Sequence, residues 1–77
     1  MNNKRRKQIE EIIEKLEVAT NDLNLLMSEE QDAFDNLPSS FQEGETGQKM
    51  EEAISNIEYA ISDIESVVTS LQDAINS

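Results

Sequence analysis

The stretch EEAISNI-EYAISDI-ESVVTSL-QDAINS, residues 51–77, decides the fold of this chain. Apolar residues fill the third, fourth and seventh place of each seven, and Met50 adds one more at the front. This spacing predicts a helix with an apolar stripe about three-sevenths of its circumference wide. A two-stranded coiled coil needs only two places in seven, so the wider stripe is typical of a helical bundle. The stripe consists of Met50, Ala53, Ile54, Ile57, Ala60, Ile61, Ile64, Val67, Val68, Leu71, Ala74 and Ile75.

The N-terminal part of the chain predicts a first helix at about residues 3–35 with the same repeat. Thr20 and Glu30 interrupt its stripe. We expect Glu30 either to reach water near the end of the bundle or to pair with Lys49. The stripe consists of Ile9, Ile12, Ile13, Leu16, Ala19, Thr20, Leu23, Leu26, Met27, Glu30, Ala33, Phe34 and Leu37.

The segment between the helices, about residues 36–46, holds proline and glycine and predicts a loop. Pro38 disfavours helical geometry at Leu37 and ends the first helix, although residues 38–42 can form one short turn of their own. We expect Phe41 to fold back over the open end of the core, and Gly44 or Thr46 to cap a second helix at about residues 47–76. Two helices of equal length joined in this way predict an antiparallel hairpin, with residues 1–77 forming a single all-α domain.

Two helices alone cannot cover two stripes this wide. The chain has no cysteine and no histidine, so disulfides and the commonest zinc ligands cannot compensate for its small size. Two hairpins packed face to face would cover both stripes, so we expect a homodimeric four-helix bundle. The alternatives are a tetramer, or a hairpin that binds a different protein. The expected oligomer core is formed by Leu16, Leu23, Ile54, Ile57, Ile61, Ile64, Val68 and Leu71.

The formal charge of −11 is unevenly distributed. Residues 4–7 form a basic cluster, whereas Lys15 and Lys49 are the only later cations against seventeen carboxylates. Such a surface repels nucleic acid and lipid and attracts a protein with a basic surface. In a hairpin the cluster lies beside the C-terminal end of the second helix, which favours cations. The alternative is a phosphate contact, but no aromatic residue interleaves the cluster, so we expect no direct nucleic-acid binding.

Catalysis, cofactors and membranes find little support in the sequence. Acid–base or nucleophilic chemistry needs a cleft or a histidine, so we expect no enzyme and no cofactor. The loop-end carboxylates match no calcium or di-iron motif, so we expect no metal site. Ser55, Ser62 and Thr69 recur every seven residues and should be exposed. No apolar run is long enough to span a membrane, which predicts a cytoplasmic protein.

Apolar residues away from the stripe and carboxylates on the outer faces are the candidate protein-binding residues. Val18, Leu25 and Tyr59 share one place in the repeat, and Val18 and Leu25 would form a small patch; incidental exposure is the alternative. The acidic candidates are Glu10, Glu14 and Glu17 on the first helix and Glu51, Glu52, Glu58 and Glu65 on the second. The simpler interpretation is that these carboxylates only keep the bundle soluble.

Two segments carry a resemblance: residues 30–42, EQDAFDNLPSSFQ, and residues 47–54, GQKMEEAI, together with the basic start. With these segments the chain resembles a group of small acidic proteins encoded by phages and prophages of low-GC Gram-positive bacteria. The specific part is the Asn-Leu-Pro turn with a glutamine four residues after the proline, and Gly44 departs from the group, which commonly has a serine cap there. The group implies no activity for individual residues, but it implies a host-cell cytoplasmic setting and an inhibitor of a host or defence protein, whose carboxylates mimic nucleic-acid phosphates.

The sequence therefore predicts a non-enzymatic protein-binding module, most specifically a small acidic inhibitor. The alternative is a structural or assembly protein of a phage or mobile element. A third hypothesis, a metal-dependent activity at the acidic loop end, rests only on the local density of carboxylates.

Overall fold

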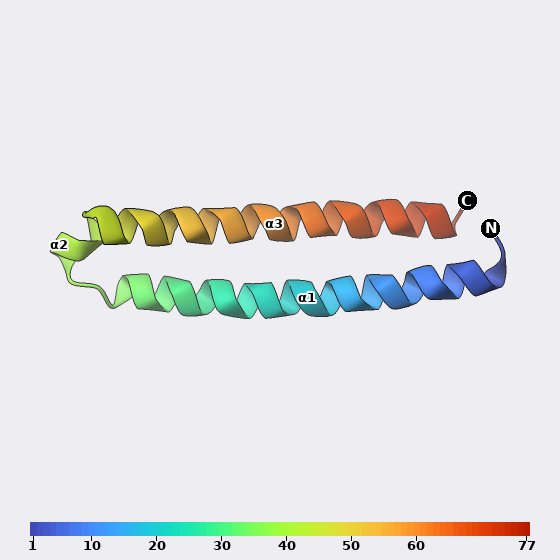
Figure 1. The fold of residues 1–77 in the computed structure, drawn as a ribbon, viewed down its shortest axis with the longest axis horizontal. Coiled ribbons are helices and arrows are strands. Elements are labelled where there is room, and N and C mark those ends of the chain that lie inside the picture. The colour runs from blue at the N-terminus through green and yellow to red at the C-terminus, as the bar shows by residue number, and fades with distance from the viewer.

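A computed structural model describes all 77 residues and shows an all-helical, antiparallel hairpin (Figure 1). The long helices α1, Asn3–Asp35, and α3, Glu45–Ile75, run side by side, and the short helix α2, Ser39–Gln42, lies at the turn. The Cα atoms span 58 × 15 × 11 Å. The prediction of two long packed helices is confirmed, and α3 begins two residues earlier than expected. None of the helices combines the length and the apolar character that a membrane span requires.

Arg6 ties the two ends of the hairpin together. Its Nε donates a hydrogen bond to the carbonyl oxygen of Ile75 at 3.1 Å, and the Asn2 side chain caps α1 by accepting from the Arg5 N–H at 2.9 Å. A cation on the last carbonyls of a helix is favourable. The predicted position of the basic cluster beside the end of α3 is thus confirmed through Arg6, while Lys4, Arg5 and Lys7 are exposed.

The surface that joins α1 and α3, which we call the seam, uses only two of the three apolar places in each seven. Its residues recur at alternating intervals of three and four, and all are buried or half-buried. Ile13 and Ile61 are the most enclosed, at 7% and 8% exposure. The seam consists of Ile9, Ile13, Leu16, Thr20, Leu23, Met27, Glu30 and Phe34 on α1, and Gly47, Met50, Ile54, Ile57, Ile61, Ile64, Val68, Leu71 and Ile75 on α3. The residues expected to form an oligomer core therefore lie between the two helices of one chain.

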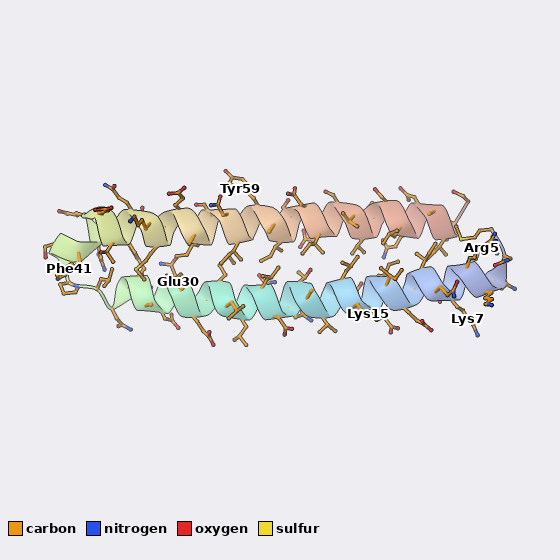
Figure 2. All side chains as sticks on the ribbon, in the orientation of Figure 1. Arg5, Lys7, Lys15, Glu30, Phe41 and Tyr59 are labelled. Carbon is orange, nitrogen blue, oxygen red and sulfur yellow. The ribbon has the colours of Figure 1, made fainter.

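The two polar residues of the α1 seam are accommodated differently. Thr20 donates its hydroxyl to the Leu16 carbonyl oxygen at 2.9 Å, which satisfies the group inside its own helix. Glu30 is half-buried and lies on the side of α1 that faces α3 (Figure 2). Of the two alternatives for Glu30, the pair with Lys49 does not form, because Lys49 Nζ lies 3.0 Å from Glu45 Oε1, one turn away on its own helix. Glu30 instead keeps partial contact with water.

Gln42 closes the C-terminal end of α1. The last four carbonyls of a helix have no donor within the helix; at the end of α1 the Asn36 N–H donates to Asp32 and the Leu37 N–H donates to Phe34. The Gln42 side-chain Nε2 donates to the carbonyl oxygens of Phe34 and Leu37, each at 3.1 Å. Residues 39–42 form the expected short turn, which lets Gln42 point back to α1. Neighbouring side chains on a helix diverge by about 100°, so Phe41 points outward and is 56% exposed (Figure 2). The expectation that Phe41 covers the core is therefore wrong.

Gly47 allows α3 to start tightly against the turn. Gly44 is the N-cap residue of α3 and makes no side-chain cap hydrogen bond. Of the two predicted capping residues, Gly44 is therefore the one that occupies the cap, and Thr46 already lies within the helix. Gly47 is buried, and a Cβ atom there would overlap the backbone of Gln42. Close approach of two backbones, and not an unusual φ angle, is what requires glycine at this position.

Ile61→Asp tests the seam. An unpaired carboxylate cannot remain at a position with 8% exposure, so we expect a loss of more than about 3 kcal/mol and of most helicity. The exposed neighbour Ser62→Asp is the control and should change stability by less than about 0.5 kcal/mol. Circular dichroism during thermal unfolding measures both; equal melting of the two variants would show that the seam is wrongly placed.

Gly47→Ala tests the close approach at the turn. Glycine to alanine inside a helix normally stabilises by about 1 kcal/mol, but here the added Cβ meets Gln42 backbone, so we expect destabilisation. Gly44→Ala is the comparison variant: its Cβ would lie 3.2 Å from the Ser40 carbonyl oxygen, which requires a shift of only a few tenths of an ångström, so it should cost less stability than Gly47→Ala. Urea unfolding distinguishes the two, and a Gly47→Ala protein more stable than the parent would contradict the packing described.

Candidate functional site

The hairpin has two broad faces of opposite character. In an antiparallel helix pair, the positions that flank the seam on one side of each helix lie on the same face of the pair. The third apolar place of each seven, unused in the seam, therefore falls on one face from both helices. We call it the apolar face; its residues are Ile12, Ala19, Leu26 and Ala33 on α1, and Ala53, Ala60, Val67 and Ala74 on α3. Ile12, Leu26 and Val67 are 47%, 53% and 48% exposed.

The opposite broad face carries carboxylates, and we call it the acidic face. Its residues are Glu10, Glu17, Asn24 and Gln31 on α1, and Glu51, Glu58, Glu65 and Gln72 on α3, all exposed. Shallow grooves run between the helices on this face. Glu17 and Glu65 from the two helices line one groove, together with Thr20 and Thr69. Glu10 and Gln72 line a second groove near the chain termini. Each groove thus has acidic or amide side chains at its edge and seam residues at its floor.

The carboxylates of the acidic face have no counter-ions within the chain. Lys49–Glu45 is the single ion pair of the structure, and both of its side chains are largely exposed. Thr69 donates its hydroxyl to the Glu65 main-chain carbonyl oxygen at 3.1 Å, so it leaves the Glu65 carboxylate free. Unpaired carboxylates in a row produce a negative potential that attracts lysine and arginine side chains of another protein.

The predicted apolar binding residues do not form one patch. Val18, Leu25 and Tyr59 are 59%, 62% and 69% exposed. Their shared place in the repeat points away from the seam, so Val18 and Leu25 lie on the outer edge of α1 and Tyr59 on the outer edge of α3. Figure 2 shows Tyr59 pointing away from α1. Within one chain, Tyr59 cannot join the other two residues in a single contact.

The remaining acidic candidates also lie on the outer edges. Glu14 lines a shallow depression on α1 with Val18 and Lys15. Glu52 occupies the same place in the repeat as Tyr59, one heptad earlier on α3. Of the acidic candidates, the structure therefore brings together Glu10, Glu17, Glu51, Glu58 and Glu65 on one face. Glu14, one helical turn from both Glu10 and Glu17, borders this face, and Glu52 lies on the outer edge of α3.

The loop-end carboxylates do not converge on a common point. No group of three or more histidine, cysteine or acidic side chains is arranged to hold a metal ion. No buried side-chain nitrogen or oxygen lacks a hydrogen-bond partner. What the arrangement offers to another molecule is extended surface, apolar on one side and acidic on the other.

Comparison with known proteins adds no family to this description. No family model matches the chain, and neither does any curated protein or solved structure.

Leu26→Glu tests the use of the apolar face in the predicted homodimer. Leu26 lies on the apolar face, so a carboxylate there should raise the dimer dissociation constant at least tenfold. Leu25→Glu is a matched control: it makes the same change one residue away, at a side chain of similar exposure (62% against 53%), and should leave the constant within twofold. Sedimentation measures both, and equal dissociation of the two variants would contradict the assignment of the face.

Proposed function

We propose that the chain is a non-enzymatic protein-binding module that self-associates through its apolar face and binds a basic protein surface with its acidic face. The observation that carries the proposal is the segregation of apolar and acidic residues onto opposite faces. Glu17 and Glu65 occupy equivalent places on the two helices, as do Ile12 and Val67. A chain that needed charge only for solubility would have no physical reason to keep one whole face free of it.

Self-association places the acidic faces to the outside. When two hairpins bury their apolar faces against each other, they form a four-helix bundle with an acidic face on each broad side. The bundle then has two equivalent binding surfaces, and a basic partner with two sites gains from engaging both. The grooves edged by Glu17 and Glu65 can each receive a lysine or arginine side chain between the helices.

An inhibitory role is the most specific form of this proposal. The resemblance to small acidic phage and prophage proteins supports a host or defence protein as the target. A rigid row of carboxylates can occupy a surface that normally binds nucleic-acid phosphates, because both ligands are anions held by arginine and lysine.

An assembly role in a phage or mobile element is the second candidate. The apolar face favours it, because the same surface can dock into a larger oligomer. Salt distinguishes the two: a complex held by the acidic face should weaken steeply between about 0.05 and 0.5 M salt, whereas one held by apolar packing should not.

A pair of charge-matched variants tests the acidic face. Glu10→Gln, Glu17→Gln, Glu58→Gln and Glu65→Gln together remove four charges from this face. Glu11→Gln, Asp32→Asn, Glu52→Gln and Asp73→Asn together remove four charges from exposed outer-edge positions. A partner captured from host cells by the parent, purified and titrated, should bind the first variant at least tenfold more weakly and the second within threefold.

The comparison also has a clear negative result. Equal loss of affinity in both variants would mean that only net charge matters, and no loss in either would mean that the acidic face is not the binding surface. Circular dichroism of the two variants confirms that both retain the helical fold, since all eight substituted side chains are exposed.

A further inference from the structure

We propose that the second copy packs on the apolar face in the reversed direction, with its loop end against the terminal end of the first copy. The loop end is the end of the hairpin at α2, and the terminal end is the one where both chain termini lie (Figure 1). This inference rests on the self-association proposed above and adds the direction in which the two copies meet.

The exposed area supports a second copy as the occupant of the face. The chain exposes 5707 Å², whereas a compact monomer of 8.7 kDa exposes roughly 4,700 Å². The excess of roughly 1,000 Å² is close to the roughly 800 Å² that each partner buries in a stable complex. The radius of gyration, 17.4 Å, likewise exceeds the roughly 11.5 Å of a compact chain of this length.

The sizes of the residues on the apolar face favour the reversed direction. Along α1 they alternate between large and small: Ile12, Ala19, Leu26, Ala33. A twofold axis across the helices, between Ala19 and Leu26, places each α1 antiparallel to the α1 of the other copy. Leu26 of either copy then lies on Ala19 of the other, and Ile12 lies on Ala33. Large residues packed onto small ones fill space without voids.

The residues of α3 on the apolar face are consistent with the same twofold axis. The residues that line the two grooves give the register: Glu17 lies across from Glu65 and Glu10 across from Gln72, so residues of α1 and α3 whose numbers add to about 82 lie at one level. The axis then passes near Ala60, and Val67 of either copy lies near Ala53 of the other. With both copies in the same direction, α1 would lie on α3 of the other copy, and Ile12 and Val67 of both copies would meet at one level. That arrangement packs two of the three large residues, Ile12 and Val67, against each other and Ala19 against Ala60, whereas reversed packing places no two of the large residues against each other.

The charges of the two ends favour the same direction. The terminal end carries the basic cluster, with Arg5 and Lys7 visible there in Figure 2. The loop end carries the exposed carboxylates Glu29, Asp32, Asp35, Glu43 and Glu45. Reversed packing places each basic end beside an acidic end, whereas packing in one direction gathers like charges at both ends. Phe41, exposed at the loop end, then lies near Arg5 of the second copy, where a guanidinium can stack on its ring.

Two charged residues of α1 also favour the reversed direction. Lys15 and Glu29 occupy the same place in the repeat, beside the apolar face. In reversed packing, Lys15 of one copy is level with Glu29 of the other, at two symmetric sites. Glu30, half-buried in the seam, lies far from its symmetry mate. Packing in one direction would place the two Glu30 carboxylates at the same level inside the bundle, where like charges repel strongly.

Spin-label distances test the direction directly. The chain has no cysteine, so Gln8→Cys and Asp22→Cys each give one label per chain at an exposed side chain. At about 1.5 Å per residue, reversed packing separates the two Gln8→Cys labels by roughly 45 Å. The Asp22→Cys labels lie beside the twofold axis and should be less than about 30 Å apart, which matches the width of a four-helix bundle.

Each result has one meaning. A long distance at residue 8 together with a short distance at residue 22 supports the reversed direction. Short distances at both residues overturn it but keep the self-association, because labels at the same level are separated only by the width of the bundle. No dipolar coupling at either residue, in labelled proteins that remain helical, overturns the self-association as well.

Discussion

The structure depends on one geometrical constraint: a pair of helices can bury two apolar places in each seven between them, but this chain has three. The seam buries two of these places, and Ile13 and Ile61 within it are only 7% and 8% exposed. The third place, with Ile12, Leu26 and Val67, remains about half exposed. Burial of apolar area is the main source of stability in a chain this small, so the uncovered face is the feature from which the proposed assembly and function follow.

Charged residues are also unevenly distributed over the hairpin, both between its two broad faces and between its two ends. Across its thickness, carboxylates such as Glu17 and Glu65 occupy the face opposite the apolar one, so a bundle formed through the apolar faces keeps its charge outside. Along its length, the basic cluster and the loop-end carboxylates give the hairpin ends of opposite sign. Two copies that each carry −11 repel one another overall, and in the proposed reversed packing the contact between ends of opposite sign would offset part of that repulsion.

The sequence predicts the hairpin well because its repeat is regular over both helices and Pro38 interrupts it once. It predicts the turn less well, because the details there depend on contacts between residues with no periodic pattern. Gln42 donates to the end of α1, which turns Phe41 outward, and Gly47 is required by a backbone contact that no local propensity indicates. The repeat also implies the division into apolar and acidic faces, once the antiparallel direction of the helices is known. The separation of Tyr59 from Val18 and Leu25 also follows from the antiparallel direction of the helices. The repeat of either helix taken alone does not indicate it.

We propose that the apolar face belongs to an interface between two copies of the chain. Sedimentation equilibrium of the unmodified protein tests it most directly, since the mass of one chain is 8.7 kDa. The account predicts a species of twice that mass at micromolar concentration, with a helical spectrum that weakens as dilution separates the copies. A stable, fully helical species of 8.7 kDa across the whole concentration range would contradict it.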